Sequence, residues 1–229
     1  MKHLLTVITA AVILLTCNAG SALAAQIPFT LHRADESITA IVRKEGGQAV
    51  LKETWYNTSF YLDTSTSVNQ LAIQPVNPAA YEQALNEVKF ASNRLKQYHV
   101  YILPYMLKNY AGVQALTFKT NTTVVFANTW LLTDKATHKL AAHELGHQVD
   151  FQLMTPERWA KYRKIRGIEN YKYDNASKEH KDRPQEIFAE DFRILFGGSL
   201  AAEKPHENSE LKDPREIPDL KAFFEELAA

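Results

Sequence analysis

Residues 133–154 read TDKATHKLAAHELGHQVDFQLM, which is the pattern of one long helix packed into a domain. Thr133 is a typical N-cap, because its hydroxyl can accept a hydrogen bond from a backbone N–H of the first turn. Apolar residues recur around the middle of the segment, at Leu140, Ala141, Val149 and Leu153. We therefore predict a helix from Asp134 to about Met154.

The centre of this helix contains the sequence HELGH, from His143 to His147. Positions i and i+4 of a helix lie on the same face, so the two imidazoles can bind one Zn²⁺ ion. Glu144 lies beside the first ligand and can reach a zinc-bound water, whose pKa the metal lowers to about 7. We expect Glu144 to be the general base that takes the proton of this water.

Two further residues of the helix need an explanation. Gly146 costs roughly 1 kcal/mol of helix stability relative to alanine, so we predict that another segment packs closely against that turn. Asp150 follows His147 by three residues and lies on the same stripe of the helix. Its carboxylate would either orient a neighbouring group of the site, as a supporting residue, or form an ordinary surface ion pair.

A zinc site also needs a third protein ligand. No histidine follows between Gln148 and Glu157, so the close histidine spacing of the metzincins is absent. A second predicted helix, residues 182–196, contains Glu186 and Glu190 among apolar residues. Two carboxylates beside a buried face need a partner, which a metal would supply; ordinary salt bridges are the alternative.

The segments HELGHQVD (143–150) and RPQEIFAEDF (183–192) together resemble the lethal-factor-like zinc metallopeptidases of the gluzincin type. This family includes the small secreted Pro-Pro endopeptidases, and the resemblance covers roughly residues 80–200. It implies that His143, His147 and Glu186 bind one catalytic Zn²⁺ and that Glu190 supports them. It also implies Glu144 as the base, and substrates that contain proline.

The family uses a tyrosine upstream of the third ligand to stabilise the oxyanion of the transition state. The matching position here is Glu179, and the preceding loop is longer. Tyr171 or Tyr173 would fill the role, and His180 is another candidate donor. The glycine-rich loop that covers the cleft in Pro-Pro endopeptidases has no counterpart in this sequence.

The N-terminus has the features of a secretory signal peptide, namely Lys2, an apolar run over residues 4–15 and the small residues that end at Ala24. We expect cleavage near Ala24 and a secreted protein. An uncleaved anchor is less favoured because a membrane span needs roughly 20 apolar residues. Cys17, the only cysteine, would permit lipoprotein processing, but Thr16 fits such a site poorly.

The composition excludes some partners. The 26 Lys and Arg residues equal the 26 Asp and Glu residues in number, so the chain has no net charge with which to attract nucleic acid or an anionic membrane. Hydrophobic residues make up 45% of the chain, as is usual for a soluble globular protein. We expect an extended peptide or protein substrate, no nucleic acid and no stable membrane insertion.

The rest of the chain predicts an α+β, zincin-like fold in which a small sheet packs on the metal-binding helix. Residues 25–76 form a β-rich N-terminal segment, with strands over 37–43 and 48–55 around Gly46-Gly47. This segment is either a separate module or a set of strands added to the main domain, residues 77–229. Within that domain we predict a helix from Asn77-Pro78 with apolar spacing that continues to Leu95, a strand over 100–103 and a hairpin over 115–127. A further helix should start at Thr155-Pro156 and end before Gly167, Asp182 should cap the helix that runs to Phe196, and Pro218 should start the last helix. Residues 123–127 would be the sheet edge that binds substrate.

These features predict a secreted zinc endopeptidase. The main alternative is a secreted binding or toxin-like module that keeps a zincin scaffold without cleaving its partner. A binding module has no need of Glu144, and a purely structural zinc site would not leave a position open for water. Peptide cleavage would distinguish these alternatives.

Overall fold

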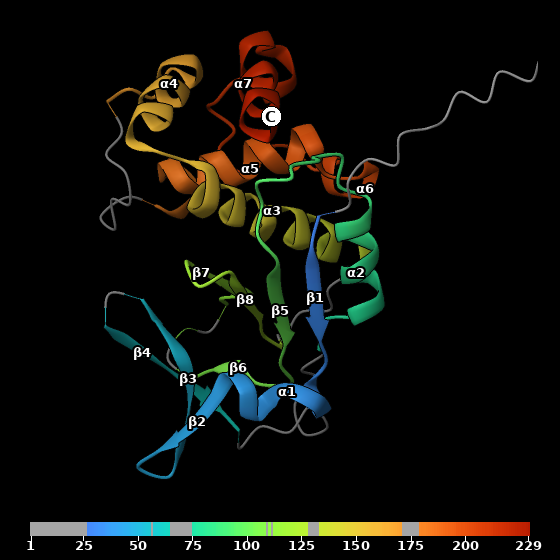
Figure 1. Cartoon of the computed structure of the whole chain (residues 1–229), viewed down its shortest axis with the longest axis vertical. Coiled ribbons are helices and arrows are strands. Elements are labelled where there is room, and N and C mark those ends of the chain that lie inside the picture. Colours follow the sequence, from blue (N-terminus) through green and yellow to red (C-terminus); the bar gives the residue numbers. More distant parts are fainter. Residues whose placement is uncertain are drawn as a thin grey trace, which may run out of the picture.

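The computed structural model describes residues 27–55, 57–64, 75–108, 110, 112–127, 133–170 and 179–229, with only the backbone of residues 34–37 (Figure 1). Its α-helices are α1 (Ala34–Ile41), α2 (Pro78–Asn86), α3 (Asp134–Leu153), α4 (Pro156–Arg166), α5 (Pro184–Phe196), α6 (Ser199–Ala202) and α7 (Pro218–Ala228). Its strands are β1 (Phe29–His32), β2 (Val42–Glu45), β3 (Gln48–Trp55), β4 (Thr58–Asp63), β5 (Tyr98–Ile102), β6 (Met106–Leu107), β7 (Ala115–Phe118) and β8 (Thr122–Val125). Two 3₁₀ turns are η1 (His180–Asp182) and η2 (Pro214–Glu216). The predicted signal peptide and Cys17 lie outside the described residues.

The strands form two four-stranded sheets. The larger sheet has the order β1-β5-β8-β7, in which β1, β5 and β8 are parallel and β7 runs antiparallel to β8. The smaller sheet has the order β2-β3-β4-β6 and is antiparallel throughout. Mixed α and β structure was predicted, and this coarse prediction is confirmed.

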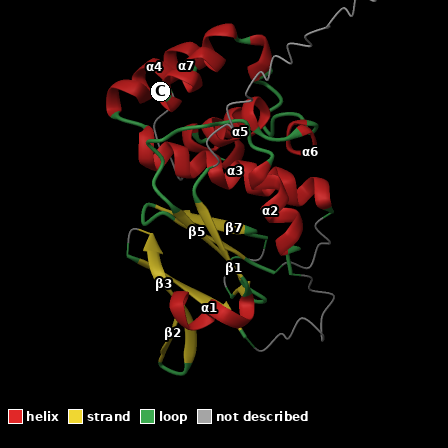
Figure 2. Ribbon diagram, turned by 45° about the vertical axis from the view of Figure 1, so that its right-hand side comes forward, coloured by secondary structure: helices red, strands yellow, loops and turns green. Residues whose placement is uncertain are grey.

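The larger sheet lies between two hydrophobic cores. Because side chains alternate along a strand, β5 places Val100 and Ile102 in one core and Tyr101 against the other. The first core lies between this sheet and helices α2, α3 and α5, with α4 and α7 stacked beyond them (Figure 1). The second core lies between the larger sheet, the smaller sheet and α1 (Figure 2). Helix α3 thus lies inside the molecule, against one face of the larger sheet.

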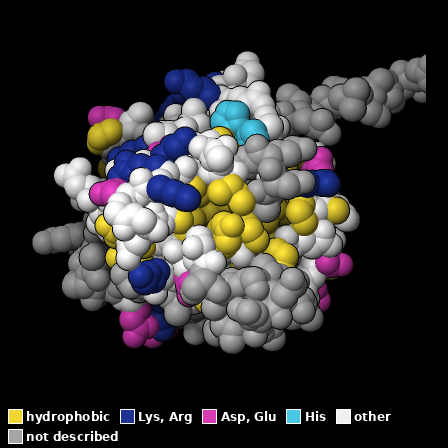
Figure 3. Space-filling view, turned by 90° about the horizontal axis from the view of Figure 1, so that it is seen from below, with side chains coloured by type: hydrophobic (Ala, Val, Ile, Leu, Met, Phe, Trp, Pro, Cys, Tyr) yellow, Lys and Arg dark blue, Asp and Glu magenta, His cyan; other side chains and the backbone are white. Residues whose placement is uncertain are grey.

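The end of the molecule formed by the smaller sheet and α1 is seen in Figure 3, where hydrophobic side chains gather beside Lys and Arg side chains. Among the described residues, no helix is both long enough and apolar enough to cross a bilayer.

The helix around the HELGH sequence begins and ends close to the predicted positions. Thr133 accepts a hydrogen bond from the N–H of Ala136 at 3.3 Å, which makes it the N-cap of α3. Thr155 caps α4 in the same way, and Gly167 ends α4 with φ of 75°. The predicted hairpins around Gly46-Gly47 and before β8 are also present.

The strand predicted over residues 37–43 is wrong in its first half. Residues 34–41 form helix α1, and strand β2 starts only at Val42. Ile38 and Ile41, three residues apart, both contact the second hydrophobic core, which a helix allows and a strand does not. Packing therefore outweighs the β propensity of this isoleucine- and threonine-containing run.

Three other boundaries differ from the predictions. Helix α2 ends at Asn86, although helical apolar spacing continues in the sequence to Leu95. The chain turns after α2, and the N–H of Lys89 donates to the carbonyl of Phe196 instead of continuing the helix. Helix α5 begins at Pro184 after Arg183, and the expected cap, Asp182, instead accepts a hydrogen bond from Asn208 at 2.8 Å. Strand β8 ends at Val125 rather than at residue 127.

Each sheet contains strands from residues 25–76 and strands from residues 77–229. Strand β1 of the N-terminal segment pairs with β5 of the larger sheet, and β6 pairs with β4 of the smaller sheet. Of the two alternatives for residues 25–76, this pairing favours strands added to the main domain.

Candidate metal centre

Helices α3 and α5 place the predicted metal ligands against one another. His143 and His147 lie one turn apart on α3, and Glu186 lies in the first turn of α5; all three side chains are largely shielded from solvent. The close packing partner predicted for Gly146 is Ala189 of α5. A Cβ added at Gly146 would lie 2.8 Å from the Cα of Ala189, so glycine is what lets the two helices approach this closely.

Three ligand atoms converge on one point. Nε2 of His143, Nε2 of His147 and Oε2 of Glu186 are each 3.2 Å from the other two. Within the described part of the chain, this is the group of histidine and acidic residues that can hold a metal ion.

The donor set fits a small divalent cation. With metal–ligand bonds of about 2.0–2.2 Å, a tetrahedral ion separates its ligand atoms by roughly 3.3–3.6 Å, close to the spacing of this triangle. Two imidazoles and one carboxylate are ligands that Zn²⁺ accepts. The structure therefore shows a buried group, His143, His147 and Glu186, that can hold a metal ion, as predicted.

The same residues shift each other's protonation in the metal-free protein. Burial lowers the pKa of His143, but hydrogen bonds to Glu186 and Glu190 outweigh burial and raise that pKa to about 10. Burial would raise the pKa of Glu186, but the neighbouring His147 and His143 hold it well below its usual range. Without metal the site is a cluster of ion pairs, and a metal must displace protons from the imidazoles to bind.

Glu190 supports His143 from the side away from Glu186. Its Oε1 lies 2.9 Å from Nδ1 of His143. A carboxylate can only accept, so Nδ1 must donate, and in the neutral imidazole this leaves the lone pair on Nε2, toward His147 and Glu186. The predicted supporting role of Glu190 thus has a geometric basis.

Arg193 holds Glu190 in place and was not predicted from the sequence. Its Nε and Nη2 donate to the two oxygens of Glu190 at 2.9 and 2.8 Å. The guanidinium also bonds to the backbone carbonyls of Ala201, Lys204 and Pro205. Arg193 follows Glu190 by three residues on α5, and this i, i+3 spacing was the available signal.

Glu144 lies at the interface of α3 and strand β7. Its side chain is 7% exposed, and Oε2 accepts a hydrogen bond from Oγ1 of Thr117 at 2.5 Å. Oγ1 of Thr123 on β8 lies 2.9 Å from that hydroxyl. Thr117 was not predicted, because its contact with Glu144 depends on how the sheet packs against α3.

His180 is the predicted oxyanion donor that the structure brings to the metal ligands. Its Nε2 is 3.2 Å from Oε2 of Glu186, and its Nδ1 is 3.7 Å from a carboxylate oxygen of Glu207. The His180 side chain is 60% exposed, so it faces solvent at the mouth of the site. Tyr171 and Tyr173, the other predicted donors, lie outside the described residues.

Asp150 has a contact that joins two helices. Its Oδ1 accepts a hydrogen bond from Nε1 of Trp159 on α4 at 3.0 Å, and the side chain is buried. This bond holds α4 against α3, whereas the sequence predicted either a residue that supports the metal ligands or a surface ion pair.

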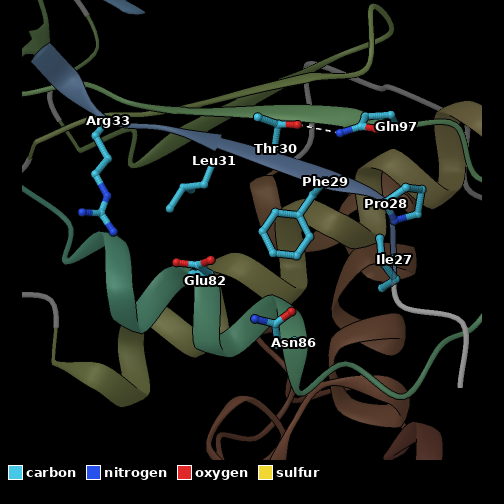
Figure 4. Close-up of a pocket in the computed structure, with 9 residues that line it drawn as sticks. All are labelled: Ile27, Pro28, Phe29, Thr30, Leu31, Arg33, Glu82, Asn86 and Gln97. Atoms are coloured by element: carbon cyan, nitrogen blue, oxygen red, sulfur yellow. Dashed lines mark hydrogen bonds between the residues drawn. The ribbon is translucent and has the colours of Figure 1, made fainter. Parts of the chain in front are cut away.

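A groove of about 730 Å³ lies at the other edge of the larger sheet, between β1 and α2 (Figure 4). Side chains of Phe29, Leu31 and Glu82 face one another across it, and Arg33 lies at one end. None of the metal ligands lines this groove, so it is separate from the metal centre.

Comparison with models of protein families, with curated proteins and with solved structures finds no match to this chain.

Proposed function

We propose that this chain is a zinc-dependent endopeptidase with a zincin-like domain of the gluzincin type. The observation that supports it most is the triangle of His143, His147 and Glu186, with the carboxylate of Glu144 one residue from the first ligand. This donor set suits Zn²⁺, and the adjacent carboxylate suits a general base.

The bound ion would supply a Lewis acid that polarises the scissile carbonyl and makes water acidic enough to be deprotonated near neutral pH. Glu144 takes the proton of the attacking water and passes it to the leaving amine. The hydroxyl of Thr117 holds Oε2 of Glu144 and leaves Oε1 for proton transfer. Glu190, gripped by Arg193, keeps the imidazole of His143 in the orientation and protonation state that a ligand needs.

His180 is the described side chain best placed to stabilise the oxyanion. Its Nε2 lies beside Glu186, and its exposed ring faces the side from which substrate would enter. An N–H of the His180 ring can donate a hydrogen bond to a developing negative charge. Tyr171 and Tyr173 remain alternatives for this role.

The substrate would bind along strand β7. The sequence placed the substrate edge at residues 123–127, but β8 lies inside the sheet, paired with both β5 and β7, and β7 is the outer strand. The backbone N–H of Phe126 donates to the carbonyl of Gln114. In an antiparallel pair only every second residue forms such backbone hydrogen bonds with the partner strand. The backbone groups of Ala115 and Thr117 therefore point away from β8. No described strand pairs with that edge, and an extended peptide can add to it.

We also propose that the protein acts outside the cell, because the first 24 residues have the pattern of a signal peptide. The alternative of a non-catalytic binding module has one specific weakness. The carboxylate of Glu144 is buried beside the metal site, and the hydroxyl of Thr117 holds it in place. A binding module has no use for such a carboxylate.

Zinc content and peptide hydrolysis test the proposal together. The mature protein should bind about one Zn²⁺ per chain and cleave members of a peptide library. Glu186→Ala should lose the zinc, and Glu144→Gln should keep it while turnover falls by at least a thousandfold, as expected for loss of the general base. A wild-type protein without zinc after metal is supplied, or a fully active Glu144→Gln variant, would refute it.

A further inference from the structure

Two large apolar side chains are exposed among the described residues, Trp55 at 37% and Tyr110 at 45%. Trp55 ends strand β3, and Tyr110 lies between β6 and β7. Both rings rest on the same buried pair. Trp55 meets the edge of Phe118, Tyr110 contacts Phe60, and Phe60 and Phe118 meet edge to face with centroids 6.0 Å apart. The two exposed rings are therefore linked through one buried aromatic pair, and we call Trp55 and Tyr110 together the aromatic shelf.

The shelf adjoins the outer strand of the larger sheet. Phe118, which supports Trp55, is the residue after Thr117, which holds Glu144. Successive side chains of a strand point to opposite faces, so β7 directs Thr117 toward α3 and Phe118 toward the smaller sheet. Strand β3 extends toward this side of the larger sheet (Figure 2). Thr117, which contacts Glu144, and Phe118, which contacts Trp55, thus lie on opposite faces of β7, which is an edge strand of the larger sheet among the described strands.

A peptide added to the edge of β7 would meet both surfaces. In an added strand every second side chain points toward α3, and the intervening side chains point toward the smaller sheet. A substrate residue next to one that faces the metal centre would therefore direct its side chain toward the face of β7 that carries Phe118, on which Trp55 packs. Exposed aromatic rings over a buried aromatic base offer apolar contact area and ring edges to such a side chain.

We propose that Trp55 and Tyr110 form a substrate subsite that selects a large apolar side chain, aromatic or branched aliphatic, of an extended peptide bound along β7. The inference rests on the proposed function and adds a selectivity that the metal ligands do not determine. The occupant is a peptide side chain because Trp55 packs on Phe118 of β7, whose outer edge pairs with no strand in the described part of the chain.

The test measures peptide selection with and without cleavage. The full mature chain bearing Glu144→Gln is immobilised, and a library of unlabelled peptides is passed over it; the retained sequences are identified by mass spectrometry. The same library is digested with the protein that keeps Glu144. Both readouts are repeated with Trp55→Ala, Trp55→Phe and Tyr110→Ala. Tyr61→Ala is the matched control, because Tyr61 follows Phe60 on β4 and its side chain therefore points to the other face of the smaller sheet.

The expected result is enrichment of large apolar residues at one position of the retained peptides. Trp55→Ala and Tyr110→Ala should each reduce that enrichment about tenfold, Trp55→Phe should restore much of it, and Tyr61→Ala should leave it unchanged. Enrichment that survives both alanine variants, or no peptide retained by any variant, would overturn the subsite. Retention that depends on Trp55, together with no cleavage by the protein with Glu144, would keep the subsite and remove the peptidase.

Discussion

Gly146 shows how a single residue can be unfavourable for its helix and favourable for the molecule. By helix propensity alone, Gly146→Ala should stabilise α3 by about 1 kcal/mol. The added Cβ, however, would lie 2.8 Å from the Cα and 3.1 Å from the carbonyl oxygen of Ala189. Both are backbone atoms, so α3 and α5 must separate. We predict a net loss of about 1–3 kcal/mol in unfolding free energy, measured by urea denaturation.

Moving α5 would also move Glu186 away from the histidines, so Gly146→Ala should weaken zinc binding as well. A control is Lys135→Ala, which removes a partly exposed ion pair with Glu203 from the first turn of the same helix and should change the unfolding free energy by at most about 0.5 kcal/mol. If Gly146→Ala were more stable than the native protein, the close packing of α3 on α5 would be wrong.

Glu186 and Glu190 both contact His143, yet their removal should have different consequences. Glu186→Ala removes a ligand, so zinc should be lost. Glu190→Ala keeps His143 as a ligand but removes the carboxylate that accepts the hydrogen bond of its Nδ1. Loss of such a supporting group typically costs about 10- to 100-fold in metal affinity. It also leaves the buried Arg193 guanidinium with carbonyl partners alone, and losing one partner of a buried ion pair costs about 3–5 kcal/mol.

Zinc titration against a chromophoric chelator and urea denaturation of the metal-free variants measure the two effects separately. The control is Glu225→Ala, which removes an exposed pair with Lys221 and should change the unfolding free energy by at most about 0.5 kcal/mol. A Glu190→Ala variant as stable as this control would mean that Arg193 is not held by Glu190.

Helices α3 and α4 show which element boundaries a sequence reveals. Their ends depend on local chemistry, namely the hydroxyls of Thr133 and Thr155 and the positive φ of Gly167, so both were predicted closely. The start of α1 and the end of α2 depend on contacts with distant segments, which residue patterns do not encode. The hairpin of β7 and β8 was predicted, but the choice of outer strand depends on where β5 pairs.

The metal centre divides in the same way. His143, Glu144 and His147 lie on one helix, so spacing alone places them together, and Glu186 followed from a second helix with carboxylates beside an apolar face. Thr117 was missed because no local pattern indicates which strand residue packs against Glu144. Arg193 could have been found from its spacing to Glu190, since both lie on α5.

The two threonine caps allow a prediction about α3 and α4 as elements. Each hydroxyl accepts one backbone N–H at 3.3 Å, so Thr133→Ala and Thr155→Ala should each cost about 0.5–2 kcal/mol of unfolding free energy. Serine at either position should retain most of the stability, because it keeps the hydroxyl. Thermal or urea denaturation of the four variants measures this. Alanine variants with unchanged stability would show that these helix ends are not held by their caps.

The charge distribution of the whole molecule predicts acid sensitivity of the metal-free protein. The neighbouring His180 and Lys139 side chains hold the pKa of Glu207 at about 2, against the opposing effect of burial. Burial would raise the pKa of Glu190, but His143 and Arg193 hold it well below its usual range. Both carboxyls have lower pKa values in the folded than in the unfolded chain, where they titrate near about 4.3. The native state therefore binds fewer protons.

It follows that their contribution to stability is complete above about pH 5 and is lost progressively as the pH falls toward 2. Urea denaturation of the chelator-treated protein at steps of pH measures the slope. Glu207→Gln should reduce it, and Glu203→Gln, which changes an exposed carboxylate, should not. A flat profile between pH 5 and 2 would contradict the ion-pair cluster.

Alkaline conditions should affect the metal-free and zinc-loaded molecules differently. In the metal-free protein the Glu186 and Glu190 hydrogen bonds overcome burial and raise the pKa of His143 to about 10, above the unfolded value near about 6.5. Between these two pKa values the folded state holds a proton on His143 that the unfolded chain has lost. The stability that the charged His143 contributes is therefore complete below about pH 6.5 and is lost as the pH rises through about 10. A metal ligand must be a neutral imidazole, so zinc binding removes that proton in advance.

We therefore predict that chelator-treated protein loses stability between pH 6.5 and 10, whereas zinc-loaded protein does not lose the His143 contribution over this range. Free zinc at about 100 times its dissociation constant should add about 2.7 kcal/mol of stability. Zinc added in weakly buffered solution near pH 8 should also release protons, which a pH indicator records. Equal alkaline slopes for both forms, with no proton release, would mean that zinc does not bind through His143, and the charge cluster would then be an internal ion-pair network of the fold.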